Sequence, residues 1–144
     1  MIARFPKVQY ANLSSRQKES FNFQKISAVL ADYGFATTRL TDDPSGADFT
    51  AKHIDGEVLN VQLTGRITIS GKYQGKSLWV ACPHEDGWLI YPHDEAIQII
   101  ESAAPFLNSK SWQEKKLYNW PSPSKALVQA LSEYFVKGDA SAGS

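Results

Sequence analysis

Residues 46–66 read GADFTAKHIDGEVLNVQLTGR and carry the most regular pattern in the chain. Asp55-Gly56 lies between two runs rich in strand-forming residues, and both residues tolerate the positive φ that a tight turn requires. The second run alternates between apolar and polar residues, as expected of a strand with one buried face. Its apolar members are Leu59, Val61, Leu63, Ile67 and Ile69. The sequence therefore predicts a β-hairpin whose second strand continues to Ile69.

The same alternation predicts the register of the hairpin. A loop of only two residues would place Asp48 opposite Leu63 and would set polar side chains against apolar ones along the whole ladder. A loop of three residues, or a bulge beside Asp55-Gly56, puts Asp48 on the same face as Gln62 and Thr64. We therefore predict the bulged form.

A long helix and a strand precede this hairpin. Ser14 and Gln17 match a capping box, and apolar residues at helical spacing follow, so we expect a helix over residues 15–33. Gly34 is well placed to end it. Residues 35–40 read as a strand, and residues 41–46 are turn formers.

After the hairpin, residues 78–82 and 88–91 read as two further strands. Asp94 is expected to cap a helix that runs to Ala104, and Ser122 to cap a last helix that includes Phe135. Residues 106–120 show no single period. The order predicts a mixed α/β (α+β) fold, with an N-terminal helix and a central sheet of about five strands flanked by helices.

Composition sets limits on organisation and location. The 144 residues carry no formal net charge, so binding to nucleic acid would need a local basic patch. We expect one domain over residues 1–137 and, from composition, a disordered tail over 138–144. The single Cys82 excludes an intramolecular disulfide, and its apolar surroundings predict a buried, inert thiol. With no long apolar run and no signal-peptide pattern, the sequence predicts a cytoplasmic protein that does not bind membranes.

The order of helix, strand and hairpin, with Gly46-Ala47-Asp48 on the hairpin and then Val61-Gln62-Leu63-Thr64-Gly65-Arg66, resembles the PD-(D/E)XK (restriction-endonuclease-like) nuclease superfamily over residues 14–104. The resemblance implies a divalent metal site, for Mg²⁺ with Mn²⁺ as a substitute, in which Asp48 and Gln62 are ligands. It also implies that Glu19, on the first helix, completes the site. The implied reaction is hydrolysis of nucleic-acid phosphodiesters, with DNA as the expected partner.

The chain departs from the pattern of that family at Thr64, which stands where the family has a catalytic Lys. A hydroxyl carries no charge and cannot stabilise the nucleophile as an ammonium does. Lys52, on the same strand face as Asp48, could replace it. So could Arg66 beyond Thr64, or Lys72 and Lys76 in the following loop, but an Arg would act as a charge clamp and not as a base.

Other interpretations of these residues stay open. Asp48 could cap its own loop, Gln62 and Thr64 could belong to a solvated sheet face, and Glu19 could be an ordinary exposed helix residue. The cations Arg66, Lys72 and Lys76 could be a wet edge or a patch that contacts phosphates. The alternative function is a non-catalytic module that binds nucleic acid or protein on the same scaffold. Nucleases of this size often need a second subunit to span a duplex, which leaves a homodimer open.

Overall fold

The capping box that the sequence predicts does begin the first long helix, α1 (Ser15–Ala31). Ser14 Oγ accepts the Gln17 N–H at 3.2 Å, and the Gln17 side chain accepts the Ser14 N–H at 2.8 Å. These two bonds satisfy backbone donors that have no partner inside the helix. Three buried residues of α1 pack against the sheet: Ile26, Val29 and Leu30.

The predicted hairpin follows, and its register is the bulged one. The computed structural model describes residues 1–138, and in it β1 (Phe35–Arg39), β2 (Phe49–His53) and β3 (Val58–Leu63) form an antiparallel meander. Phe49 pairs with Val61, and the His53 N–H donates to Glu57 O at 2.8 Å. The loop therefore has three residues, with Gly56 at φ +101°.

The second strand does not run to Ile69, so the prediction of one long strand is wrong. β3 ends at Leu63, and β4 (Ile67–Ser70) leaves the main sheet to pair with β7 (Leu117–Trp120) in a separate two-stranded sheet. The Thr64 hydroxyl donates to Arg66 O at 2.8 Å and closes the turn between the strands. All four residues of β4 are buried, but its apolar residues still alternate with polar ones in the sequence, so the period is unchanged where the chain passes from one sheet to the other.

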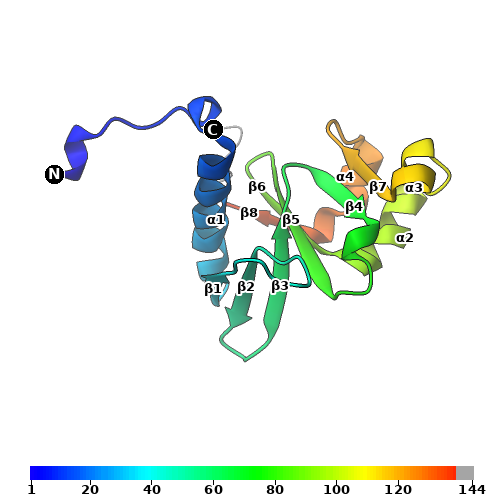
Figure 1. Cartoon of the computed structure of the whole chain (residues 1–144), viewed down its shortest axis with the longest axis horizontal. Coiled ribbons are helices and arrows are strands. Elements are labelled where there is room, and N and C mark those ends of the chain that lie inside the picture. Colours follow the sequence, from blue (N-terminus) through cyan, green and yellow to red (C-terminus); the bar gives the residue numbers. More distant parts are fainter. Residues whose placement is uncertain (139–144) are drawn as a thin grey trace.

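The main sheet is mixed, and its order is β1-β2-β3-β5-β6-β8 (Figure 1). β3 and β5 (Leu78–His84) are parallel, while every other neighbouring pair, including β6 (Gly87–Pro92) with β8 (Phe135–Lys137), is antiparallel. The connection between β3 and β5 consists of β4 and the short 3-10 helix η3 (Gly71–Tyr73). The fold is thus mixed α/β, as predicted, with six strands in the main sheet where about five were expected.

Three predictions near the C-terminus need correction. α2 (His93–Ala103) is preceded by Pro92, and Asp94 does not cap it because its carboxylate accepts from the Gly75 N–H at 2.8 Å. α4 (Lys125–Ala130) is capped by Ser124 and not by Ser122. Residues expected to extend this last helix instead form η4 (Ser132–Tyr134) and β8, because β8 completes the edge of the sheet beside β6.

Two cores lie on the two faces of the main sheet. One is covered by α1, and the other is built with α2, α4 and the β4–β7 sheet. α3 (Lys110–Lys115) and β7 lie at the end of the molecule away from α1 (Figure 1). Residue 138 is bonded to the β5–β6 turn through its N–H, and residues 139–144 of the predicted tail lie outside the described part of the chain. Within residues 1–138, no helix combines the length and the apolar character needed to cross a membrane.

Candidate functional site

Asp48 is fixed at the edge of the sheet where β2 begins and β3 ends. Its carboxylate Oδ2 accepts the Leu63 N–H at 2.8 Å. Its own N–H donates to Val61 O at 2.7 Å, and its carbonyl accepts the Leu40 N–H at 2.9 Å. Three neighbouring strand ends therefore hold this half-buried carboxylate in one place.

Glu19 lines the same cavity as Asp48, as the resemblance implies. The cavity has a volume of about 70 Å³, and its walls are Glu19, Phe23, Arg39, Leu40, Asp48 and Leu63. α1 supplies Glu19, and the last residue of β1 supplies Arg39. The Arg39 guanidinium carbon lies 5.6 Å from the centre of the Phe23 ring, and the charge of Arg39 acts on the Asp48 carboxylate in the shared cavity. Nothing in the sequence around Arg39 distinguishes it from other residues at strand ends.

The surroundings of Asp48 disfavour its charge. Burial is the main cause that raises the pKa of Asp48, and the nearby negative charge of Glu19 raises it further. The Leu63 N–H and the positive charge of Arg39 act in the opposite direction without cancelling the rise. A perturbed carboxylate in a cavity is typical of a functional site, because a bound cation or proton relieves the unfavourable charge.

Gln62 faces a different cavity from Asp48. Its side-chain amide donates to Leu63 O at 3.3 Å. It lines a space of about 190 Å³, together with Asp43, Pro44, Ser45, Gly46, Lys72, Tyr73 and Lys76. The two cavities flank the same strand ends, since Leu63 lines one and Gln62 lines the other. The structure thus brings Gln62 together with Lys72 and Lys76, and the role of Gln62 as a metal ligand stays a prediction.

Tyr73 lines the Gln62 cavity and is close enough to Asp48 to be affected by its charge. Burial raises the pKa of its phenol, and the charge of the Asp48 carboxylate raises it further. Its ring packs edge-on against His93, with centroids 5.4 Å apart. Tyr73 therefore stays protonated at neutral pH and can donate a hydrogen bond toward an anion at this edge.

None of the replacements considered for the missing Lys reaches the Asp48 cavity. Within the part of the chain that the structure describes, no lysine lines that cavity. Lys52 is exposed near the other end of β2, about 13 Å along the strand at the usual rise per residue. Arg66 is exposed in the turn that follows Thr64. Arg39 is thus the cation that shares the cavity with Asp48.

The donors around Asp48 fit a Mg²⁺ ion only in part. Asp48 Oδ2 is already bonded to the Leu63 N–H, which leaves Oδ1 and the Glu19 carboxylate as donors. Among residues 1–138, no group of three or more His, Cys, Asp or Glu side chains could hold a metal ion. Since Mg²⁺ is commonly held by one or two carboxylates with substrate phosphate, the site fits an ion shared with a phosphate and not one held by the protein alone.

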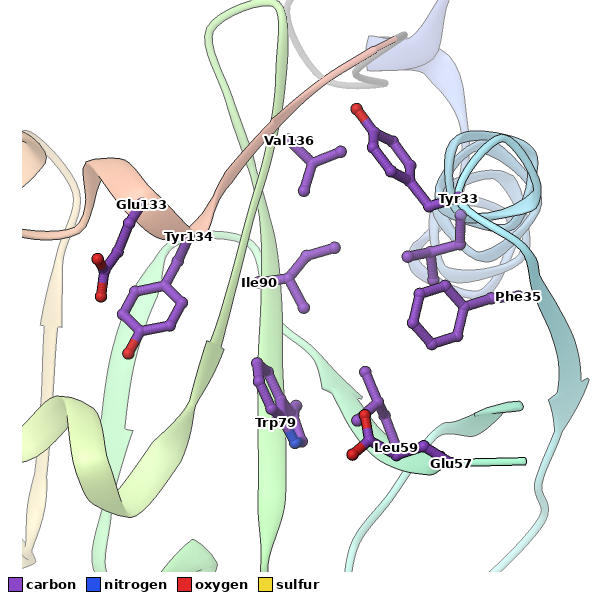
Figure 2. Close-up of a pocket in the computed structure, with 10 residues that line it drawn as sticks. Tyr33, Phe35, Glu57, Leu59, Trp79, Ile90, Glu133, Tyr134 and Val136 are labelled. Atoms are coloured by element: carbon purple, nitrogen blue, oxygen red, sulfur yellow. The ribbon is translucent and has the colours of Figure 1, made fainter. Parts of the chain in front are cut away.

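A separate apolar cavity of about 350 Å³ lies on the face of the main sheet that α1 covers, between α1 and β8 (Figure 2). Trp79 and Ile90 form its floor on the face of the sheet, and the half-exposed Tyr33, just after the end of α1, lies at its rim. The carboxylates at this cavity belong to Glu57 and Glu133. Two carboxylates without a lysine or arginine in the lining would repel a phosphate, so this cavity does not suit an anionic ligand.

Comparison of the chain with models of protein families, with curated proteins and with solved structures found no significant match. The function is therefore inferred from the geometry and the charges at the sheet edge that carries the Asp48 and Gln62 cavities, which we call the Asp48 edge.

Proposed function

We propose that the chain has a restriction-endonuclease-like core and that it binds nucleic acid, DNA in the first place, at the Asp48 edge and hydrolyses its phosphodiester bonds with Mg²⁺. The observation that supports this most is that Glu19 and Asp48, from α1 and from the start of β2, line one cavity at the end of β3. Bound Mg²⁺ would supply Lewis-acid polarisation of the phosphoryl oxygen and a water of lowered pKa. Mn²⁺ would serve as its substitute.

The residues have distinct tasks in this proposal. Asp48 and Glu19 provide the carboxylate oxygens, and Asp48 is held in position by the Leu63 N–H at 2.8 Å. Arg39 is a permanent cation that neutralises a phosphate oxygen but does not take up a proton. Turnover is expected to be slow, because Thr64 carries a hydroxyl in place of an ammonium that would stabilise the developing charge.

Cleavage of labelled DNA in Mg²⁺ or Mn²⁺ tests the proposal. We expect Asp48→Asn and Glu19→Gln to abolish cleavage, and Thr64→Lys to increase its rate tenfold or more, a usual contribution of one well-placed charged group. Glu57→Gln is the matched control, since Glu57 lines the apolar cavity and not the Asp48 cavity. Cleavage by Asp48→Asn at the wild-type rate would refute the assignment of the site.

Calorimetry provides a second test that does not depend on turnover. Because the protein offers few donors, Mg²⁺ titrated into the protein alone is expected to bind weakly, and Mg²⁺ titrated into the protein–DNA complex more tightly. Loss of this difference in Asp48→Asn would locate the ion. Equal affinity with and without DNA would contradict the shared site.

A non-catalytic binding module is the second candidate. It is favoured by the Thr64 hydroxyl, which is engaged with Arg66 O at 2.8 Å, and by the lysines that line the neighbouring Gln62 cavity. Salt-dependent DNA binding with no cleavage, even by Thr64→Lys, would select this function.

A further inference from the structure

A basic groove opens between η3 and the junction of α3 with β7. Its volume is about 470 Å³, and it is lined by Ser70, Gly71, Lys72, Gln74, Lys115, Lys116 and Leu117. Three of these residues are lysines and none is acidic. We call the set Lys72, Lys115 and Lys116 the lysine groove.

Backbone contacts hold the two sides of the lysine groove together. The Gly71 N–H donates to Lys116 O at 2.7 Å, directly after the pairing of Ser70 with Leu117 in the β4–β7 ladder. The backbones are so close that a Cβ on Gly71 would lie 2.8 Å from Lys116 Cβ. The distance between Lys72 and Lys116 is therefore set by the β4–β7 pairing and not by flexible side chains alone.

Local structure also orients Lys116. Its backbone is left-handed, with φ +51°, and it ends α3. Its ammonium nitrogen lies 5.4 Å from the centre of the buried Trp112 ring, an arrangement that favours a cation there. Ser111 Oγ donates to Leu117 O at 2.6 Å and fastens the turn. Both Lys115 and Lys116 lie at the C-terminal end of α3, where the partial negative charge of the helix dipole stabilises a cation.

Within the described part of the chain, no ion pair neutralises the charges of the lysine groove. Within residues 1–138, none of the three lysines has a carboxylate within 4 Å. Ammonium groups around one cavity repel one another, and a bound anion removes that repulsion. The groove is thus suited to a phosphate and not to an apolar ligand or a cation.

The lysine groove is continuous with the Asp48 edge through Lys72. Lys72 lines both the groove and the neighbouring cavity that holds Gln62 and Lys76. Two adjoining cavities that share one cation suit a repeating anion better than a single phosphate ion. α3 and β7 lie on the side of β4 away from α1, so this path leads outward from the Glu19 and Asp48 cavity (Figure 1).

We propose that the lysine groove is a second contact site for the phosphates of the nucleic acid whose backbone crosses the Asp48 edge. This proposal rests on the proposed function for the class of ligand but not for the cleavage. Contacts from lysine to phosphate position a backbone without reading bases, so the groove binds without sequence preference.

Binding of a short labelled DNA duplex in EDTA, measured over a range of salt concentrations, tests the lysine groove without any cleavage. The double variant Lys115→Gln/Lys116→Gln is expected to lower the slope of log affinity against log salt by about two. Its affinity near 0.1 M salt is expected to fall by about tenfold for each lysine. The matched control is Lys110→Gln/Lys125→Gln, which removes the same charge from α3 and α4 outside the groove.

A second variant keeps every charge and changes the geometry. Gly71→Ala must move Lys116, so it is expected to weaken binding by several-fold while thermal unfolding shows a folded protein. An unchanged salt slope in Lys115→Gln/Lys116→Gln would overturn the proposal that the lysine groove binds phosphates. An equal loss of duplex affinity in the control variant would overturn it as well. So would stabilisation by inorganic phosphate with no binding of the duplex. Loss of cleavage in Asp48→Asn, with duplex binding intact, would support the proposed hydrolysis. It would also show that binding at the lysine groove does not depend on cleavage.

Discussion

At the scale of single residues, Asp48 and Asp43 are expected to affect stability in opposite directions. The pKa of Asp48 is raised by burial, so the folded state holds its proton more tightly than the unfolded state does. Its contribution to stability is present below the ordinary aspartate pKa, of about 4, and is lost as the pH rises through the raised pKa. At neutral pH, Asp48→Asn is expected to be as stable as the wild type or more stable, within about 1 kcal/mol.

Asp43 shows the reverse linkage. Its pKa is lowered by the Ser45 hydroxyl and by the Ala47 N–H, so its contribution is present above the ordinary aspartate pKa and is lost on acidification. Asp43→Asn is therefore expected to destabilise the protein at neutral pH. Urea unfolding of both variants over a pH series checks the two signs. A destabilised Asp48→Asn at neutral pH would mean that its role is structural.

The sequence indicated Asp48 and Glu19 and also the cations Lys72 and Lys76, but it did not indicate Arg39, Lys115 or Lys116. Asp48, Gln62 and Thr64 were indicated by the resemblance of their pattern to that of a nuclease family, and Glu19 by its place in the preceding helix. Arg39 joins Asp48 in the cavity because β1 pairs with β2, and a lone Arg in a strand carries no signal of that contact. Lys116 lies near Lys72 only because of a long-range strand pairing.

At the scale of elements, β8 depends on a glycine in the strand beside it. A Cβ on Gly87 would lie 2.2 Å from Val136 O, so Gly87→Ala must push β8 away from β6. We expect a loss of about 1–3 kcal/mol and faster amide hydrogen exchange in β8. Gly65→Ala is the control, because its Cβ would meet nothing within 4 Å. Equal stability of the two variants would contradict the pairing of β6 with β8.

The elements that the sequence predicted are those fixed by local signals. The capping box located α1, and the alternation around Asp55-Gly56 gave both the hairpin and its register. The separation of β4 from β3, and β8 as a strand, were missed because their positions depend on partners far from them in the chain, β7 and β6. The spacing that suggested a continued helix at Tyr134 and Phe135 reflects one turn of η4 followed by a strand.

At the scale of the whole molecule, one phenol joins the small sheet to the large one. The hydroxyl of the buried Tyr91, on β6, accepts the Thr68 N–H at 2.9 Å and donates to Thr68 O at 2.8 Å. Tyr91→Phe leaves two buried backbone groups on β4 without partners and is expected to cost about 2–3 kcal/mol in urea unfolding. Tyr118→Phe is the control, because no residue in 1–138 bonds to its hydroxyl, and it is expected to change little. Equal effects would contradict this connection between the sheets.

His93 supports the same connection two residues further along β4. Its Nε2 accepts the Ser70 N–H at 3.0 Å, while Nδ1 bonds to Asp94 Oδ1 at 2.8 Å. Tyr91 and His93 therefore hold β4 at two points, each 23 residues later in the sequence than the residue it holds. During synthesis, α1 and the β1–β3 meander leave the ribosome well before either anchor does. The cavity lined by Glu19 and Asp48 can thus assemble on the growing chain first. Lys72 and Lys76, between β4 and β5, reach their places only after β6 and β7 have emerged.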